Sequence, residues 1–330
     1  MRIPGLKTLK QFSHRISSRF SNHALILGYH RIAQVEHDPF KMCVSPNHFA
    51  EQLAVLRQHC QVISLSRLIE GMKTGHFPEQ AVALTFDDGY ADVLQNASLL
   101  LEAYQFPATV FVVSGNAGGQ FWWDRLERAF LRSAAQPEPA ALSHSATTHK
   151  TRQSGQQQER LTPNARTRHP VLVELYRQLK NASPEEREQV IAELEKSAGS
   201  GTTRGEAYGR TMSWDELIAL TASGLIEIGS HSVSHPWLAE LKPESLKDEI
   251  SQSKFILEKN LGREVTSFSY PNGSVSTEVV TMVKQSGFHC ACTSANGVVM
   301  KNGDIFQLPR FWISDWDGAA FERWLKMWKS

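Results

Sequence analysis

The chain has 330 residues, of which 41% are hydrophobic and 21% charged, a composition typical of a globular protein that can bury a sizeable core. Its formal net charge is +1, so no overall field favours nucleic acid as a partner. No stretch of the sequence approaches the length of a membrane span. The four cysteines show no CxxC spacing, and we expect reduced, mostly buried thiols in a cytoplasmic protein.

Residues 1–23 form a basic amphipathic segment ahead of the predicted core. Apolar residues recur at helical spacing over residues 6–20, with lysine and arginine between them. This pattern indicates either an interfacial helix in peripheral contact with a membrane, or a helix that packs on the domain or frays. The segment has no unbroken apolar run and no small-residue cleavage site, so we predict a cytoplasmic protein, membrane-associated under the first alternative.

From residue 24 onward, short apolar runs alternate with helical patterns. Ser45 and Pro46 are typical of a helix start, as N-cap and first helical position. The alternation predicts a parallel sheet, either open or closed into a barrel. In this first half we expect strands at residues 24–30, 61–64, 81–86 and 108–113, with helices from 46, from 64 and through 94–100.

The alternation breaks after Asp124. Residues 134–170 contain no Phe, Tyr, Trp, Ile, Val or Met, while Ser, Thr, Gln, Pro and Ala are frequent. Such a segment cannot bury enough apolar surface to offset its loss of conformational entropy. We therefore interpret about 132–210 as an insertion, partly disordered or a mobile flap, with two helices at 171–181 and 184–197.

The alternation resumes near Thr211. Ser213 and Glu216 form a capping box, which opens a helix that stops at Gly224. Both halves together give about seven strand–helix units in a core over residues 24–330. The remaining strands are expected at 225–228, 265–270, 288–293 and 306–313, and the remaining helices at 243–260, at 276–286 and in the tail that contains Phe321, Leu325 and Trp328.

Two polar motifs directly follow predicted strands. Asp87 and Asp88 end an apolar run, and their mutual repulsion requires a nearby metal or base, although a strand that ends in a polar turn would also explain them. His231 and His235 follow a second apolar run and would share one face of a helical turn. One Asp and two His make a three-ligand metal set with room for water, which leaves the second Asp free to act as a base.

These motifs, Thr-Phe-Asp-Asp-Gly at 85–89 and His-Ser-x-x-His-Pro at 231–236, resemble those of the polysaccharide deacetylase family, the NodB-homology or family-four carbohydrate esterases. The resemblance covers roughly residues 24–130 and 211–315. It implies an α/β fold, a distorted (β/α)7 barrel, and hydrolysis of acetyl groups on a sugar.

The resemblance also implies roles for the motif residues. Asp87 would be the catalytic base, and Asp88, His231 and His235 would hold one divalent metal ion. Zinc is the expected ion, with Co²⁺, Ni²⁺ and Fe²⁺ as alternatives. These side chains and His30 follow predicted strands, at the end of a barrel where catalytic groups collect.

A third family motif, commonly Arg-Pro-Pro-Tyr-Gly, corresponds to Ser-Tyr-Pro-Asn-Gly, which begins at Ser269. The resemblance implies that the backbone amide of Asn272 is the oxyanion donor, and we expect Tyr270 and Pro271 to contact substrate. The family arginine is replaced by Ser269. Arg310 is either its substitute beside the catalytic Asp or a surface arginine in a salt bridge.

The family's usual catalytic histidine motif near the C-terminus is absent. One branch of the family carries this histidine near the N-terminus in a Tyr-His segment, which Tyr29-His30 resembles. We expect His30 to protonate the leaving amine, with a neutral, packed histidine as the alternative. Trp122 and Trp123 either stack on sugar rings or anchor the insertion to the barrel.

The sequence therefore predicts a metal-dependent hydrolase that removes N-acetyl, or else O-acetyl, groups from a sugar, a glycan, or a lipid-linked or nucleotide-linked glycan precursor. Two alternatives stay open. One is hydrolysis of a non-sugar amide such as a cyclic ureide, and the other is a degenerate carbohydrate-binding barrel without turnover. The missing arginine and C-terminal histidine motif favour the binding barrel, whereas the retained metal ligands and base argue against it.

Overall fold

The computed structural model describes residues 20–21, 23–132, 170–198 and 209–328. The chain divides into two compact units. The first comprises Met1–Val35, Met42–Gly119 and Thr211–Ser330, and the second comprises Glu36–Lys41 and Gln120–Arg210. The second unit thus starts earlier than the insertion predicted at about 132–210.

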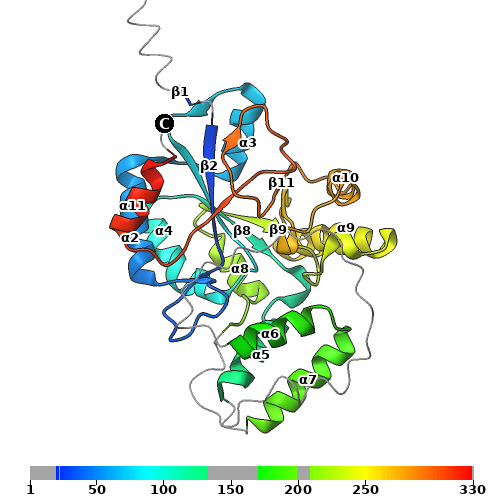
Figure 1. Ribbon diagram of the computed structural model, residues 1–330. Helices are drawn as coiled ribbons and strands as arrows, with labels where there is room; N and C mark the ends of the chain where they lie inside the picture. Colours follow the sequence, from blue (N-terminus) through cyan, green and yellow to red (C-terminus); the bar gives the residue numbers. More distant parts are fainter. Residues whose placement is uncertain (1–19, 22, 133–169, 199–208, 329–330) are drawn as a thin grey trace, which may run out of the picture. The chain divides into compact units, whose positions relative to one another are not determined.

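The first unit is built around a mostly parallel sheet that curls into a barrel (Figure 1). The strand order is β11-β10-β9-β8-β7-β2, and β13 pairs in parallel with β2. A parallel bridge between Leu308 and Cys292 of β11 links the segment before β13 to the other edge of the sheet. The chain at 308–312 therefore joins both edges, and the predicted (β/α)7 barrel is confirmed. The barrel strands are β2 (His23–Tyr29), β7 (Ala81–Phe86), β8 (Ala108–Val112), β9 (Ile226–Ser230), β10 (Ser267–Ser269), β11 (Cys290–Cys292) and β13 (Phe311–Trp312).

Short strands flank this ring. β1 (Phe20–Ser21) pairs with β6 (Phe77–Pro78), and β3 (Arg31–Ile32) with β4 (Cys43–Val44). β5 (Gln61–Val62) pairs with β7, and β12 (Val299–Met300) with β2.

The helices of the first unit begin largely where the sequence predicts. Ser45 caps α2, with its Oγ accepting a hydrogen bond from His48 N at 3.4 Å, and Ser213 and Glu216 form the capping box of α8. The helix after β7 contains one π-helical turn at Val93–Ala97. The helical segments are α2 (Pro46–His59), α3 (Leu65–Thr74), η1 (Val93–Ala97), α4 (Ser98–Tyr104), η2 (Ser114–Asn116), α8 (Trp214–Leu220), η4 (Leu238–Glu240), α9 (Pro243–Leu261), η5 (Pro271–Gly273), α10 (Thr277–Gln285) and α11 (Gly318–Lys326).

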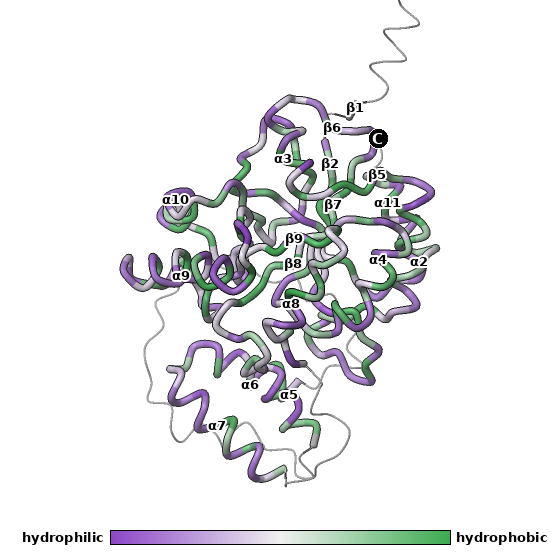
Figure 2. The backbone as a smooth tube through the Cα atoms, turned by 180° about the vertical axis from the view of Figure 1, so that it is seen from behind, coloured by the Kyte–Doolittle hydropathy of each residue, from purple (hydrophilic) through white to green (hydrophobic). Residues whose placement is uncertain are grey.

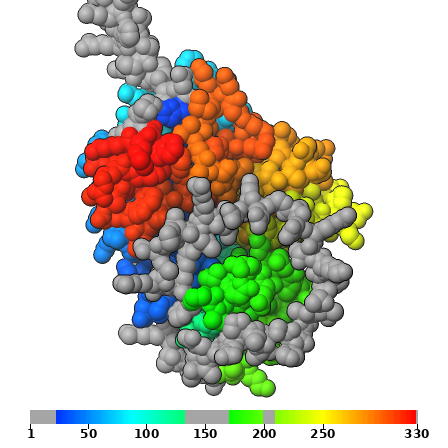
Figure 3. Space-filling view, in the orientation of Figure 1, coloured from blue at the N-terminus to red at the C-terminus, as the bar shows by residue number. Residues whose placement is uncertain are grey.

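Alternate residues of β2, β7, β8 and β11 belong to two different hydrophobic clusters, an outer and an inner layer of the core. Leu27 of β2 belongs to the larger cluster, together with Leu53 of α2, whereas its neighbour Ile26 belongs to a second cluster with Leu68 of α3. Helix α3 therefore packs against the interior side chains of the barrel. Figure 2 shows hydrophobic colouring on the central strands. Figure 3 shows α9 and α10 side by side on one face of this unit, with the orange segment that follows α10 lying between them and α11.

The second unit consists of helices α5 (Trp122–Arg132), α6 (Pro170–Lys180) and α7 (Pro184–Ser197). Its core includes Leu126 and Phe130 of α5, Leu175 of α6 and Ile191 of α7. Helices α6 and α7 confirm the two predicted at 171–181 and 184–197. The sequence does not predict α5, although Leu126 and Phe130 have helical spacing. The segment expected to be disordered or mobile, 134–170, lies outside the described residues except for Pro170.

The predicted amphipathic segment at 6–20 also lies outside the described residues except for Phe20. That residue pairs with Pro78 between β1 and β6, and does not continue a helix. Among the helices that the structure describes, none combines the length and apolar character needed to cross a membrane.

Candidate metal centre and active site

Asp87 and Asp88 stand at the carboxyl end of β7. All six residues of β7 are buried, and Asp87 N donates to the carbonyl of Tyr29 at 2.9 Å, which extends the pairing with β2 by one residue. Asp88 and Gly89 both have a φ of 72°, a region that residues with a Cβ rarely adopt. Both carboxylates are only 3% exposed. A strained turn that holds two adjacent acids inside the protein indicates a functional site.

Arg310 is fully buried and faces Asp87. Its Nη1 and Nη2 donate to Oδ1 and Oδ2 of Asp87 at 2.7 and 2.8 Å, a two-bond ion pair. Its remaining N–H groups donate to Oγ of Ser269 at 2.9 Å, Oγ1 of Thr85 at 3.3 Å and the carbonyl of Thr293 at 3.0 Å. The alternative of a surface arginine is therefore wrong, since all five donors of the guanidinium have acceptors inside the barrel.

Ser269 links this arginine to the carboxylate. Its Oγ accepts from Arg310 and donates to Oδ2 of Asp87 at 3.0 Å. Burial by itself raises the pKa of Asp87, but the charge and hydrogen bonds of Arg310 hold that pKa well below its usual range. The pKa of Arg310 is raised in turn by Asp87, in spite of burial. Asp87 is therefore ionised at neutral pH.

Asp88, His231 and His235 bring one ligand atom each to a common point. Oδ1 of Asp88 lies 3.5 Å from Nε2 of each histidine, and the three ligand atoms lie within 4.8 Å of one another. Two ligands at about 2.1 Å from a tetrahedral ion are about 3.4 Å apart, so this spacing fits one shared ion. Nδ1 of His231 lies 2.7 Å from the carbonyl of Ser269, which fixes its proton there and leaves Nε2 as the ligand atom. Burial lowers the pKa of both histidines and favours the neutral form that metals bind.

The two histidines lie on a loop between β9 and η4, so the expected helical turn is wrong. Ser232 and His235 both have positive φ, at 64° and 61°, and His235 N donates to Oγ of Ser232 at 3.0 Å. These two left-handed residues fold the loop back. Both imidazoles face Asp88 as a result.

His30 follows β2 at the same edge of the barrel and interacts electrostatically with Asp87 and Arg310. Its ring stacks on Trp312, with centroids 4.5 Å apart and planes at 16°. The guanidinium carbon of Arg310 lies 4.6 Å from the centre of the same indole. Burial lowers the pKa of His30 to about 4, although the charge of Asp87 opposes this shift.

The sequence does not single out Thr85 or Trp312 for this site. Both could be found from the strand period, because Thr85 lies two residues before Asp87 and Trp312 two residues after Arg310. Residues two apart on a strand point to the same side, in this case the barrel interior.

Asn272 lies in the turn η5 after β10, is exposed, and has a φ of 56°. The amides of Gly273 and Ser274 close this turn by donating to the carbonyls of Tyr270 and Pro271, so they are occupied. The Tyr270 and Pro271 side chains are buried, and the Tyr270 hydroxyl donates to the carbonyl of Phe306 at 2.8 Å. This placement favours packing over the substrate contact predicted for these two residues.

Trp122 and Trp123 belong to the second unit. Trp123 is buried and stacks on Phe121 with centroids 4.3 Å apart. Trp122 stacks on Tyr176 at 5.0 Å, and the guanidinium carbon of Arg187 lies 4.7 Å from its ring centre. Both indoles have packing partners within that unit, and their stacking on sugar rings stays a prediction.

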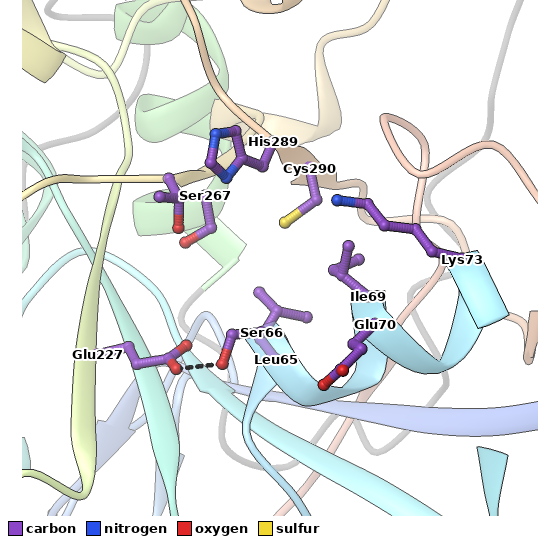
Figure 4. Close-up of a pocket in the computed structure, with 10 residues that line it drawn as sticks. Leu65, Ser66, Ile69, Glu70, Lys73, Glu227, Ser267, His289 and Cys290 are labelled. Carbon is purple, nitrogen blue, oxygen red and sulfur yellow. Dashed lines mark hydrogen bonds between the residues drawn. The ribbon is translucent and has the colours of Figure 1, made fainter. Parts of the chain in front are cut away.

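A pocket lies at the opposite end of the barrel strands (Figure 4). Glu227, Ser267 and Cys290, which line it, stand at or next to the first residues of β9, β10 and β11. From α3, Ser66 donates its hydroxyl to Glu227 Oε1 at 2.5 Å, and Lys73 lines the pocket as well. The residues that line this pocket include none of those predicted for the active site.

Comparison with known proteins points to one family. A curated relative from Staphylococcus aureus, named poly-beta-1,6-N-acetyl-D-glucosamine N-deacetylase, is 29% identical over 110 residues, which cover 29% of this chain and 38% of the relative. A putative polysaccharide deacetylase of Bacillus subtilis, YxkH, is 26% identical over 105 residues, or 32% of this chain and 38% of that protein. The chain therefore matches well under half the length of these curated relatives.

Solved structures share the fold over nearly the whole chain. The IcaB protein of Ammonifex degensii matches with a TM-score of 0.61 and 17% identity, over 94% of this chain and 98% of that one. The deacetylase PplD of Streptococcus pyogenes, solved in complex with acetate, matches with a TM-score of 0.58 and 16% identity, over 91% of this chain and 97% of that one. The sequence model of the family described as polysaccharide deacetylase matches residues 74–200 and 201–291, most of the chain. This chain belongs to the polysaccharide deacetylase family.

Proposed function

We propose that the chain is a metal-dependent deacetylase that removes N-acetyl groups from a glycan. The observation that carries the proposal is the convergence of Asp88, His231 and His235 beside the ion-paired Asp87. One carboxylate and two imidazoles suit zinc, and also Co²⁺, Ni²⁺ and Fe²⁺. When bound, such an ion polarises a carbonyl and lowers the pKa of water, which is what amide hydrolysis requires.

Asp87 accepts the proton of the attacking water in this proposal. Its Oδ2 accepts hydrogen bonds from Arg310 and Ser269, whereas Oδ1 accepts one from Arg310. Because each carboxylate oxygen has two lone pairs, Oδ1 keeps one for the incoming proton. Arg310 orients the carboxylate and keeps it ionised. In the family that the motifs resemble, the arginine of the third motif would have this role.

His30 is the proposed acid for the leaving amine. Its pKa of about 4 makes it neutral at pH 7, so the proton that it gives to the amine must be taken up during turnover, and the proton that Asp87 removes from the water is the proposed source. The stack on Trp312 holds its ring in one orientation. The backbone amide of Asn272, in the turn after β10, is the proposed donor to the oxyanion.

The proposed substrate is an acetylated glucosamine polymer. The name of the Staphylococcus aureus relative supports this, since that protein is a poly-β-1,6-N-acetylglucosamine N-deacetylase by name. An O-acetylated sugar and a lipid-linked glycan precursor are the alternative substrates that the sequence leaves open. The cytoplasmic location and the membrane contact through residues 6–20 stay proposals, and membrane fractionation of the native host is their test.

The deciding experiment measures acetate release from β-1,6-linked and β-1,4-linked N-acetylglucosamine oligomers and from an O-acetylated sugar. We expect release from at least one N-acetylated oligomer, its loss on addition of a chelator, and its recovery on addition of Zn²⁺ or Co²⁺. Glycan binding without acetate release would favour the degenerate binding barrel. Hydrolysis of allantoin without action on sugars would favour the non-sugar amide hydrolase.

A further inference from the structure

The loop that carries the two histidines is held by a residue outside the recognised motifs. Glu249 lies on α9, and its Oε2 accepts hydrogen bonds from the backbone amides of Val233 and Ser234, both at 2.9 Å. Its Oε1 accepts a third from the Ser234 hydroxyl at 2.5 Å. One carboxylate therefore engages two of the residues between His231 and His235.

Helix α9, which lies beside β9 (Figure 1), also holds the other side of the first histidine. Ser253 is one helical turn after Glu249, so both side chains lie on the same face of the helix. Oγ of Ser253 is 2.6 Å from Oγ of Ser230, the residue before His231, and both serines are fully buried. Helix α9 thus holds the side chain of the residue before His231 and the backbone of the loop after it.

The same loop also contacts the segment after β8. Ser114 N and Gly115 N donate to the carbonyls of Ser232 and Val233 at 3.1 and 2.9 Å. A Cβ at Gly115 would lie 2.7 Å from the Val233 carbonyl oxygen, so the two backbones are in close contact. The hydrogen bonds to this segment and those to Glu249 therefore both restrain the backbone between His231 and His235.

Both sets of hydrogen bonds hold the loop in a backbone conformation that is locally unfavourable. Ser232 and His235 hold positive φ values without being glycine. If the carboxylate contacts were lost, these residues could return to ordinary φ values, and the His235 ring would turn away from Asp88.

We propose that Glu249 is a positioning residue for the metal centre, because its bonds to the loop fix His235 relative to Asp88 and His231. The inference rests on the proposed metal-dependent function and adds to it a residue that touches neither the ion nor the substrate. The packing of α9 on the barrel does not depend on this carboxylate, since the helix buries the apolar side chains Leu246, Ile250 and Leu257.

The test compares Glu249→Gln with Asp248→Asn, which removes the same charge from the exposed neighbouring position on α9. The oxygen of glutamine can still accept from both amides, but the variant removes the negative charge that strengthens these bonds and the acceptor for the Ser234 hydroxyl. We expect the Zn²⁺ affinity, measured by competition with a chromophoric chelator, to fall about ten- to a hundredfold in Glu249→Gln. It should stay within about twofold in Asp248→Asn. The visible absorption of bound Co²⁺ should change in Glu249→Gln alone.

Unchanged Zn²⁺ affinity in Glu249→Gln would overturn the inference, and so would an equal loss in Asp248→Asn, which would indicate a general charge effect. If Glu249→Gln were unfolded in the absence of metal, Glu249 would be needed for folding and the positioning role would be overturned. Ser253→Ala removes the contact on the other side of His231 and should weaken Zn²⁺ binding in the same direction. If the wild-type protein bound no divalent ion at all, the proposed metal site would fail first, so the two failures are distinguishable.

Discussion

Arg310 and Asp87 are 223 positions apart in the chain, yet they form a buried two-bond ion pair at the carboxyl end of the barrel strands. Taking both charges out of water is costly, and the cost is offset only where every donor and acceptor finds a partner. Here Thr85, Ser269 and Thr293 satisfy the remaining donors of the guanidinium. Removing either member would leave the other as an unpaired buried charge, so it should lower the free energy of unfolding by more than removing a surface charge does.

Arg310→Met should leave Asp87 buried without its cation. We expect a loss of about 3–5 kcal/mol in the free energy of unfolding, measured by urea titration, and a large loss of turnover. Arg310→Lys should recover little, since an ammonium cannot make the parallel pair of bonds. Adding Asp87→Asn to Arg310→Met should restore part of the stability and none of the activity. An Arg310→Met protein as stable as the wild type would contradict this account.

One metal ion per chain should stabilise the folded protein. Because the ligands Asp88, His231 and His235 meet only in the folded state, saturating Zn²⁺ at about 100 times its Kd adds about 2.7 kcal/mol. Dialysis against a chelator should therefore lower the melting temperature, and Zn²⁺ or Co²⁺ should restore it. His235→Ala should abolish this response, whereas Asp87→Asn should bind the ion and release no acetate. A metal response that survives in His235→Ala would rule out this ligand set.

Local patterns in the sequence predict most of the barrel. Apolar runs that end at Asp87 and before His231 become β7 and β9, and the capping signals at Ser45 and Ser213 start α2 and α8. Parallel strands end at the same edge of a barrel, so the candidate ligands could be placed together from strand order alone.

Features that depend on distant contacts could not be predicted in this way. The i, i+4 spacing of His231 and His235 fits a helical turn as well as a loop, and the loop that the chain adopts makes hydrogen bonds to Glu249 and Gly115, which are distant in sequence. The pairing of Arg310 with Asp87 depends on the closure of the barrel by the last strand. No local pattern distinguishes such an arginine from a surface one.

The pH dependence of stability should report on His30. The unfolded chain takes up a proton at this residue near its usual pKa of 6.5, whereas the folded protein does so only near 4. Between these values the unfolded state binds more protons than the folded state. The contribution of the neutral His30 to the free energy of unfolding is therefore fully present above about pH 6.5 and is lost as the pH falls toward 4. The unfolding free energy of the metal-free protein should therefore decrease more steeply over this range in the wild type than in His30→Gln, which lacks this group. Equal slopes in the two proteins would show that the His30 pKa is not lowered.

Gly28 should be needed for the placement of both His30 and Arg310. A Cβ at Gly28 would lie 2.9 Å from two carbons of the Trp312 indole, the ring that contacts both side chains. Gly28→Ala should therefore push the indole aside, and we expect a drop of about tenfold or more in kcat with little change in Zn²⁺ affinity, because the indole contacts His30 and Arg310, which are not proposed ligands. Trp312→Leu in the same background should relieve the clash and recover stability, but not kcat, since the stack on His30 is then missing. If Gly28→Ala kept full kcat, the indole would not be what holds His30 and Arg310 in place.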